Sequence, residues 1–265
     1  MFNFFQSKES KMRASATLVS DILLELASLT KPGVPLDMLD ELAARRIEEA
    51  GAVAANKNYK PEWAPIPFPA TICCSVDYEI CHAPPRGRTL QEGSIVKYDL
   101  GIRLNGAYGD AAITVAVGQV DNRKNRAMRY GLQALYEGIK VVKAGVSISA
   151  IGRAIEHFCA LRGYTVIREF GGHHIGTKAM HEPPFIPNVY YKEDEDKVLK
   201  EGSVICIEPM ISPGKGRSVI AREDGWTSFV PDRQVVIMYE EMLMVTKNGY
   251  EILTNHLGNK GKVLE

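Results

Sequence analysis

One stretch of the chain, residues 90–118, restricts the possible fold more than any other, because it is typical of a β-hairpin that carries two carboxylates. An Asn-Gly dipeptide at 105–106 separates two runs rich in Ile, Val, Leu and Tyr, and both residues tolerate the positive φ of a type I′ turn. A two-residue loop pairs Gly101 with Asp110 and leaves Asp99 on the same face as Asp110. The pair predicts either a solvated hairpin edge or a shared cation.

Three sequence matches recur in the same order and at similar offsets along the chain. The matched pairs are 91–99 with 200–208, 31–51 with 143–163, and His82 with His181. The first pair places Glu208 where the other copy has Asp99. Such matches predict an internal duplication, with halves of about 8–120 and 121–258, rather than a short-period solenoid. Carboxylates from both halves are then expected to converge across a pseudo-twofold axis.

Composition excludes several classes of protein. The 265 residues carry a formal net charge of zero with both signs mixed along the chain, which argues against a nucleic-acid groove or a membrane-surface patch. No apolar run is long enough to span a bilayer, and residues 1–12 lack the apolar core of a secretory signal. The five cysteines show no CxxC pairing, which argues against a disulfide framework or a structural zinc site. We expect a monomeric cytoplasmic protein.

Hydrophobic periodicity predicts helices and strands in both halves. The helical segments are 8–29, 36–50, 122–143 and 148–162. Strands are predicted within 70–82, 90–118, 166–176, 203–208, 234–246 and 250–254. The proline-containing stretch HEPPFIP at 181–187 is predicted to be a loop. The pattern indicates one α+β domain, residues 1–265, in which helices cover a largely antiparallel sheet.

The segment 58–69 contains four prolines, which exclude a helix or a central strand and predict an ordered loop. Its Trp63 and Phe68, together with the nearby Cys73, are apolar enough to line a pocket. The same side chains can instead pack the loop against the core, and the sequence leaves both readings open.

The chemistry of the chain gathers in carboxylates and histidines. The carboxylates in or beside apolar strands are Asp99, Asp110, Glu208 and Glu240, and the histidines in Gly/Pro-rich turns are His82, His173, His174 and His181. Burying unpaired carboxylates costs several kcal/mol each, and Arg or Lys is scarce beside them, so a divalent cation is the expected partner. The donor set suits Mn²⁺, Fe²⁺ or Co²⁺ better than a thiolate-type zinc site, with Zn²⁺ still possible. Two ions about 3.5–4 Å apart would indicate hydrolytic chemistry.

On these residues the chain resembles the type I methionine aminopeptidases, a metallopeptidase family with the pita-bread fold, over essentially its whole length. The matching stretches are KPGV from 31, CHAPP from 81, YDLG and GAYGD within 98–110, REFGGHHIG from 168, MHEPP from 180, IEPMI from 207, EDGWT from 223 and YEEMLMVTKNGYEILT from 239. The resemblance implies a pita-bread fold with two related halves and a centre that holds two divalent metal ions.

The resemblance also implies a role for each matching residue. The implied metal ligands are Asp99, Asp110, His173, Glu208 and Glu240, with the carboxylates of Asp110 and Glu240 bridging the ions. Glu208 would also act as the base, His181 would hydrogen-bond the substrate carbonyl or the tetrahedral intermediate, and His82 would contact the scissile amide. The family's apolar pocket for the first side chain corresponds to Phe68, Cys73, Met180 and Trp226.

Several positions depart from the family pattern. The family's GHGIG is here 172–176, Gly-His-His-Ile-Gly, so either His173 or His174 could be the ligand. The upstream match favours His173, and adjacent strand residues point to opposite faces, so both cannot hold one ion. Glu241 replaces a histidine, Ala111-Ala112 replaces a Thr-Ser pair, and HAPP replaces HGIP. These changes predict altered contacts around the ligands and a divergent copy of the enzyme.

Three hypotheses follow from the sequence. The first is a cytosolic metal-dependent aminopeptidase that releases N-terminal methionine from peptides and nascent proteins. The second is an Xaa-Pro peptidase of the same fold, which the chain length disfavours. The third is a pita-bread module that has lost catalysis and binds peptides or proteins, for which the departures leave room.

Overall fold

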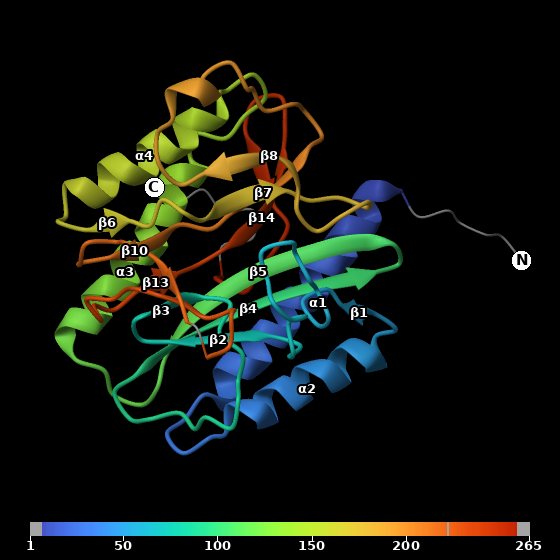
Figure 1. Ribbon diagram of the computed structural model, residues 1–265. Helices are drawn as coiled ribbons and strands as arrows, with labels where there is room; N and C mark the ends of the chain where they lie inside the picture. Colours follow the sequence, from blue (N-terminus) through green and yellow to red (C-terminus); the bar gives the residue numbers. More distant parts are fainter. Residues whose placement is uncertain (1–6, 222, 259–265) are drawn as a thin grey trace, which may run out of the picture.

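The computed structural model of the chain describes residues 7–221 and 223–258, so the expectation about a signal in 1–12 lies partly outside the described residues. The helices are α1 (Lys8–Leu29), α2 (Leu36–Glu49), α3 (Asn122–Ile139) and α4 (Ile148–Ala160). None of the helices in the described ranges is long and apolar enough to cross a membrane. Figure 1 shows α1 and α2 together on one side of the molecule, with α3 and α4 on another.

The predicted hairpin is confirmed. Strands β4 (Ile95–Leu104) and β5 (Ala107–Ala116) pair antiparallel along their whole length, with Gly101 opposite Asp110. The turn at 105–106 has φ values of 51° and 83°, which are the positive values that a type I′ turn requires. This register fixes which residues of the hairpin share a face.

Helices α1 and α2 cover one face of the hairpin sheet and enclose the first core. Strands β1 (Val53–Ala54) and β2 (Cys73–Val76) flank β4 and extend this sheet. Helix α1 lies so close to β5 that a Cβ added to Gly109 would sit 2.7 Å from the backbone of Ser15. The core between helices and sheet includes Val19, Leu23, Leu26, Leu39, Tyr98, Leu100 and Ile102.

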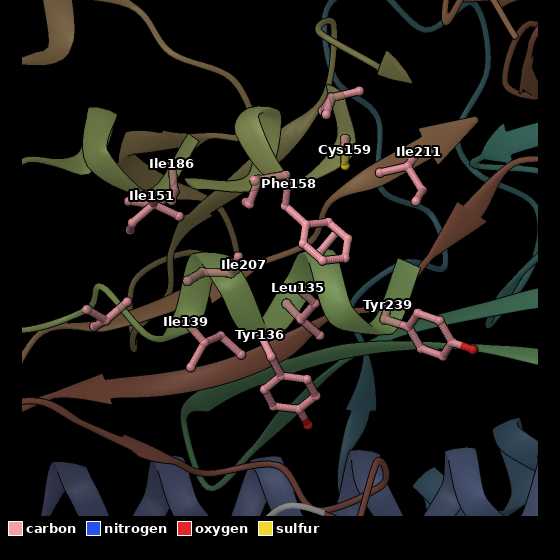
Figure 2. Packing of buried hydrophobic residues seen from close by; sticks show 14 of the residues in the cluster. Leu135, Tyr136, Ile139, Ile151, Phe158, Cys159, Ile186, Ile207, Ile211 and Tyr239 are labelled. Carbon is pink, nitrogen blue, oxygen red and sulfur yellow. The ribbon is translucent and has the colours of Figure 1, made fainter. Parts of the chain in front are cut away.

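Helices α3 and α4 pack on the second sheet, whose strand order is β15–β14–β9–β7–β8. Its strands are β7 (Gly171–His174), β8 (Glu182–Pro187), β9 (Val204–Ile207), β14 (Glu241–Val245) and β15 (Tyr250–Ile252). Figure 2 shows Leu135 of α3 beside Phe158 of α4, with Ile139 one turn further along α3, among the buried side chains of this core. Ile207 and Tyr239 belong to the same core and immediately precede Glu208 and Glu240 in the sequence. Their burial therefore anchors the backbone of both carboxylates.

Three segments differ from the sequence-based expectation. The segment 181–187 is wrong as a loop, because β8 pairs with β7 at the edge of the sheet, where prolines without an N–H are tolerated. Helix α3 ends at Ile139 rather than 143, although Val142 still packs into the core from the following turn. The strand predicted over 234–246 is interrupted at Glu240, with β13 (Ile237–Met238) before it and β14 after it.

The two halves repeat the order of their elements at the offsets found in the sequence. Helices α2 and α4 begin at Leu36 and Ile148, and strands β4 and β9 begin at Ile95 and Val204. The remaining strands are β3 (Glu79–Cys81), β6 (Thr165–Val166), β10 (Met210–Ser212), β11 (Val219–Ile220) and β12 (Ser228–Phe229). Every strand pairing in the described part is antiparallel, which agrees with the predicted α+β class. The twofold relation of the halves stays a prediction.

Candidate active site

One cavity of about 190 Å³ is lined by residues from both halves. All eleven residues that the sequence predicts for the site line it: Phe68, Cys73, His82, Asp99, Asp110, His173, Met180, His181, Glu208, Trp226 and Glu240. The lining also includes Asn56, Tyr59 and Trp63. Residues far apart in the sequence therefore meet in a single place.

Five of these side chains form the polar end of the cavity. Asp99 and Asp110 project from the paired strands β4 and β5, His173 from β7, Glu208 follows β9 directly, and Glu240 lies between β13 and β14. The hairpin register explains the first two, because alternate residues on a strand share a face and cross-strand neighbours are close.

The distances within this cluster are short. Nε2 of His173 lies 3.6 Å from Oδ2 of Asp110 and 3.9 Å from Oε1 of Glu208. Three sets of side chains have possible ligand atoms within 4.8 Å of one another: Asp99, Asp110 and Glu240; Asp110, His173 and His181; and His173, Cys206 and Glu240. Within the described residues, Glu208 belongs to none of these three sets, although it faces His173.

The electrostatics of the cluster favour a bound cation. Burial raises the pKa values of Asp99, Glu208 and Glu240 well above the usual range, and the neighbouring carboxylates add to each shift. Oδ1 of Asp110 and Oε1 of Glu240 are buried and have no hydrogen-bond partner. In the described part of the chain, no ion pair joins any of these carboxylates to Lys or Arg. Oxygen-rich donors with orphaned buried oxygens fit divalent metal ions.

The structure separates the two adjacent histidines. His173 is buried and its Nε2 faces the carboxylates, while its Nδ1 lies 3.0 Å from the carbonyl oxygen of His174. The ring of His174 turns away, and its Nδ1 lies 3.0 Å from the carbonyl oxygen of Pro184. His173, and not His174, is therefore placed to contact an ion in the cluster, as the upstream sequence match indicated.

The two other predicted histidines stand at the rim of the cluster. His82 follows β3 with φ of 58°, a left-handed backbone that is rare outside glycine and directs its ring into the cavity. Burial lowers the pKa of His82 to about 4, so its imidazole is neutral at pH 7. The ring of His181 lies 4.4 Å from that of His173, edge to face.

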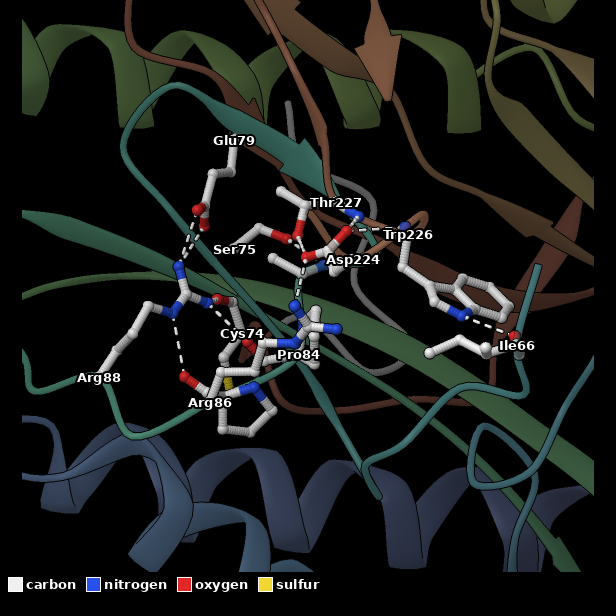
Figure 3. Close-up of polar contacts among 12 residues, drawn as sticks. Ile66, Cys74, Ser75, Glu79, Pro84, Arg86, Arg88, Asp224, Trp226 and Thr227 are labelled. Carbon is white, nitrogen blue, oxygen red and sulfur yellow. Dashed lines mark hydrogen bonds and ion pairs between the residues drawn. The ribbon is translucent and has the colours of Figure 1, made fainter. Parts of the chain in front are cut away.

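Aromatic side chains form the apolar end of the cavity. Trp226 packs edge to face on Phe68 and Trp63, with ring centroids 5.1 and 4.9 Å away, and its indole N–H donates to the carbonyl of Ile66 at 2.9 Å. Figure 3 shows this bond and the carboxylate of Asp224, which accepts from the backbone N–H of Trp226 at 2.7 Å. The indole is thus fixed from both sides.

The cavity contains residues that the sequence-based prediction missed. Asn56 accepts from the N–H of Gly101 at 3.2 Å and donates to the carbonyl of Asp99 at 3.3 Å, so it fixes β4 beside the carboxylate. The ring of Tyr59 packs edge to face on His181 with centroids 5.8 Å apart. Neither contact has a local signal, because each joins segments that are distant in the sequence. Trp63, for which the sequence left two readings, lines the cavity.

A model of metallopeptidase family M24 matches residues 10–247. The chain belongs to this family. It is 34% identical over 244 residues to a methionine aminopeptidase of Rickettsia prowazekii, covering 92% of this chain and 91% of that one. It is likewise 34% identical to methionine aminopeptidase 1 of Bacillus subtilis, covering 92% of this chain and 94% of the relative.

Solved structures agree with the family M24 assignment. A crystal structure of methionine aminopeptidase from Rickettsia prowazekii matches with a TM-score of 0.86 and 33% identity, over 92% of this chain and 95% of that one. The prolidase of Pyrococcus furiosus matches with a TM-score of 0.67 and 19% identity, over 93% of this chain and 63% of that one. The second likeness shows the fold alone. The expected pita-bread architecture, which this family shares, is confirmed.

Membership of metallopeptidase family M24 implies divalent metal ions, and the carboxylate–histidine cluster is a candidate site for them. The departures from the family pattern lie next to this cluster. Ala111 and Ala112 are buried on β5, and Ala112 forms an isolated bridge with Glu240. Glu241 points away from the cavity into a buried pocket of polar groups. The substitutions therefore change residues that contact or adjoin the predicted ligands, and they leave the predicted ligands themselves unchanged.

Replacing Gly172 with alanine is expected to destabilise the protein by about 3 kcal/mol and to weaken Mn²⁺ binding. A Cβ there would sit 1.9 Å from the carbonyl oxygen of Cys206, so β7 would move away from β9 and carry His173 with it. Urea unfolding and Mn²⁺ titration measure the two effects. Gly249→Ala is the control, because a Cβ at Gly249 meets only Oγ1 of Thr246 at 4.0 Å. Equal unfolding midpoints for the two variants would contradict the prediction.

Proposed function

We propose that the chain is a metal-dependent methionine aminopeptidase that releases N-terminal methionine from peptides and nascent proteins. The observation that carries this proposal is a single cavity with a carboxylate–histidine cluster at one end and an aromatic pocket at the other. The relatives named methionine aminopeptidase match over about nine-tenths of the chain and support the same activity.

The residues that would hold two divalent ions are Asp99, Asp110, His173, Glu208 and Glu240, with Mn²⁺, Fe²⁺ or Co²⁺ as the preferred ions and Zn²⁺ as a weaker candidate. Asp110 and Glu240 would be central to this donor set, because they are the carboxylates that appear in two of the three close sets of donor atoms. When bound, the ions supply an activated water and polarise the scissile carbonyl.

The chain's own groups then bind the substrate and transfer protons. Glu208, at the polar end beside His173, is proposed to accept the proton of the attacking water. His181 is proposed to donate a hydrogen bond to the substrate carbonyl and to the oxyanion that develops there. Neutral His82, whose Nδ1 is buried without a partner, is proposed to contact the scissile amide.

The apolar end is proposed to bind the first side chain of the substrate. Phe68, Cys73 and Trp226 are each at most 4% exposed and belong to one packed cluster, and Met180 lines the same cavity. A thioether chain fits an aromatic and sulfur-containing wall, because sulfur–aromatic contacts are favourable. The main substrates are accordingly N-terminal methionyl peptides.

The setting of this activity is also proposed. Balanced charge supports the absence of a nucleic-acid partner and of membrane association, and five reduced, buried cysteines support a cytoplasmic location. We propose that the chain acts as a monomer.

The decisive experiment is methionine release from Met-Ala-Ser by metal-stripped protein before and after reloading with Mn²⁺, Fe²⁺ or Co²⁺. We expect no turnover without metal and restored turnover with at least one ion. Ala-Pro is the matched second substrate, and faster cleavage of Ala-Pro would replace the proposal by an Xaa-Pro peptidase. Tight ion binding without hydrolysis of either peptide would favour the binding module.

A further inference from the structure

A buried polar network lies behind Glu240, on the side away from the cavity. Its members are Tyr136, Glu241, Thr254 and His256, and each residue is at most 4% exposed. None of them lines the cavity, and the proposed reaction uses none of them. Buried polar side chains are stable only when they are hydrogen-bonded, and a satisfied network beside the carboxylate–histidine cluster makes the local structure rigid.

Glu241 is the centre of this network. Its Oε1 accepts a hydrogen bond from the hydroxyl of Tyr136 at 3.1 Å, and its Oε2 accepts one from the hydroxyl of Thr254. The backbone N–H of Met242 donates to Oγ1 of Thr254 at 3.1 Å. Nδ1 of His256 lies 3.9 Å from Oε2 of Glu241. Helix α3, strand β14 and the segment after β15 therefore meet at one carboxyl group.

His256 joins this network to the strand that carries Asp110. Its Nε2 lies 3.0 Å from the carbonyl oxygen of Ala112, and since a carbonyl only accepts, Nε2 carries the proton. The same carbonyl accepts the backbone N–H of Glu240 at 3.0 Å. One oxygen on β5, two residues beyond Asp110, thus holds both the backbone of Glu240 and the imidazole of His256.

The bridge between Ala112 and Glu240 is isolated and does not continue as a ladder on either side. The next contact between the two segments is two residues away, where the backbone N–H of Met238 donates to Oγ1 of Thr114 at 3.2 Å, so the bonds at the Ala112 carbonyl are the ones that act on Glu240 itself. The second donor, from His256, restrains the carbonyl that receives the bridge, and Glu241 restrains the next residue along from Glu240. The Ala112 carbonyl that faces Glu240 and the adjacent residue Glu241 are therefore both held by hydrogen bonds.

We propose that His256 is a positioning residue for the metal centre: its hydrogen bond to the Ala112 carbonyl sets the position of Glu240 relative to Asp110, with which Glu240 shares a close set of donor atoms. The inference rests on the proposed function, because that proposal assigns both carboxylates to the ions. Outer groups that orient metal ligands typically change metal affinity by about 10- to 100-fold when they are removed.

The test compares two substitutions of one side chain. His256→Gln keeps an N–H donor near the position of Nε2, whereas His256→Leu keeps the volume and removes the donor. Metal-free proteins are titrated with Mn²⁺ by calorimetry and with Co²⁺ by visible spectroscopy. We expect His256→Leu to weaken one ion about 10- to 100-fold, to change the Co²⁺ spectrum and to lower kcat more than it raises KM. His256→Gln should stay within about threefold of the parent protein.

Ile155→Val is the control for simple loss of stability, because Ile155 is a buried core residue of α4 and is not part of the network. Ion binding in His256→Leu that matches the parent, with only a lower unfolding midpoint as in Ile155→Val, would overturn the inference. The same loss in His256→Gln as in His256→Leu would overturn it too. Tyr136→Phe keeps the aromatic ring, removes the hydroxyl that donates to Glu241, and is expected to weaken Mn²⁺ binding about three- to tenfold. Unchanged Mn²⁺ binding in this variant would count against a role of the network.

The outcomes separate this inference from the proposed function. A protein whose ion affinity depends on His256 but which releases no methionine would refute the aminopeptidase and keep the positioning role. A protein that releases methionine, and whose ion affinity does not depend on His256, would keep the aminopeptidase and refute the positioning role.

Discussion

Glu208→Gln is expected to lower kcat for methionine release from Met-Ala-Ser by about 10³-fold at saturating Mn²⁺. Glutamine keeps the size of the side chain and can still offer one oxygen to an ion, but it cannot accept the proton of the attacking water. The cluster contains three other carboxylates, and each of them belongs to at least one close set of donor atoms. Glu208 belongs to none of these sets, although its Oε1 lies 3.9 Å from Nε2 of His173. Steady-state kinetics over a Mn²⁺ series separates the loss of the base from weaker ion binding.

His174→Ala is the matched comparison for this prediction, because its ring contacts the Pro184 carbonyl and not the cluster. It is expected to stay within about threefold of the parent enzyme in kcat/KM. His173→Ala, by contrast, is expected to lose tight ion binding, since its Nε2 faces Asp110 and Glu208. A loss in His174→Ala as large as that in His173→Ala would exchange the two assignments, and a Glu208→Gln variant with near-normal kcat would remove Glu208 as the base.

The parts of the site with strong local signals were predictable from the sequence. An Asn-Gly turn fixes a register by itself, so the pairing of Gly101 with Asp110 and the common face of Asp99 and Asp110 followed from counting residues. The internal repeat then linked Asp99 to Glu208 in the other half of the chain. Both signals reflect backbone geometry or common ancestry, and neither depends on how distant side chains pack.

Features that depend on tertiary packing were not predictable in this way. The segment with Pro183 and Pro184 forms an edge strand because it pairs with β7. This tertiary pairing overrides the local preference of proline for loops. Asn56 reaches β4 from a loop that is distant in the sequence, and the bond from Tyr136 to Glu241 joins α3 to β14. The sequence marked Glu241 as a departure from the family pattern, but only the structure shows which groups surround it.

The surroundings of Glu241 lead to a stability prediction for the metal-free protein. Burial raises the pKa of Glu241 from 4.5 to about 8, and the hydrogen bonds from Thr254 and Tyr136 oppose part of that shift. The folded state therefore keeps this proton over a pH range in which the unfolded chain has released it. Stability from this group is complete below pH 4.5 and falls as the pH rises toward 8, by up to about 1.4 kcal/mol per unit.

Glu241→Gln removes the titrating proton and should remove this pH dependence. The difference in unfolding free energy, parent minus variant, is expected to fall by about 3–4 kcal/mol between pH 5 and pH 8 and to stay constant above that range. Burial lowers the pKa values of His82 and His256 to about 4, which gives the opposite slope below pH 6.5. The contribution of His82 cancels in the difference, but His256 lies 3.9 Å from Glu241 and is coupled to it, so the slope is read most directly above pH 6.5, where both imidazoles are largely neutral. Urea unfolding in the presence of a chelator, at half-unit steps of pH, measures the curve.

Tyr136→Phe supplies an independent check on the sign. It removes a hydrogen bond that lowers the pKa of Glu241, so the decline in stability should extend to higher pH than in the parent protein. Parallel curves for the parent and Glu241→Gln would mean that the carboxyl is already ionised in the folded state at pH 5. The buried charge would then need a permanent partner, and His256, 3.9 Å away, would have to carry the compensating proton.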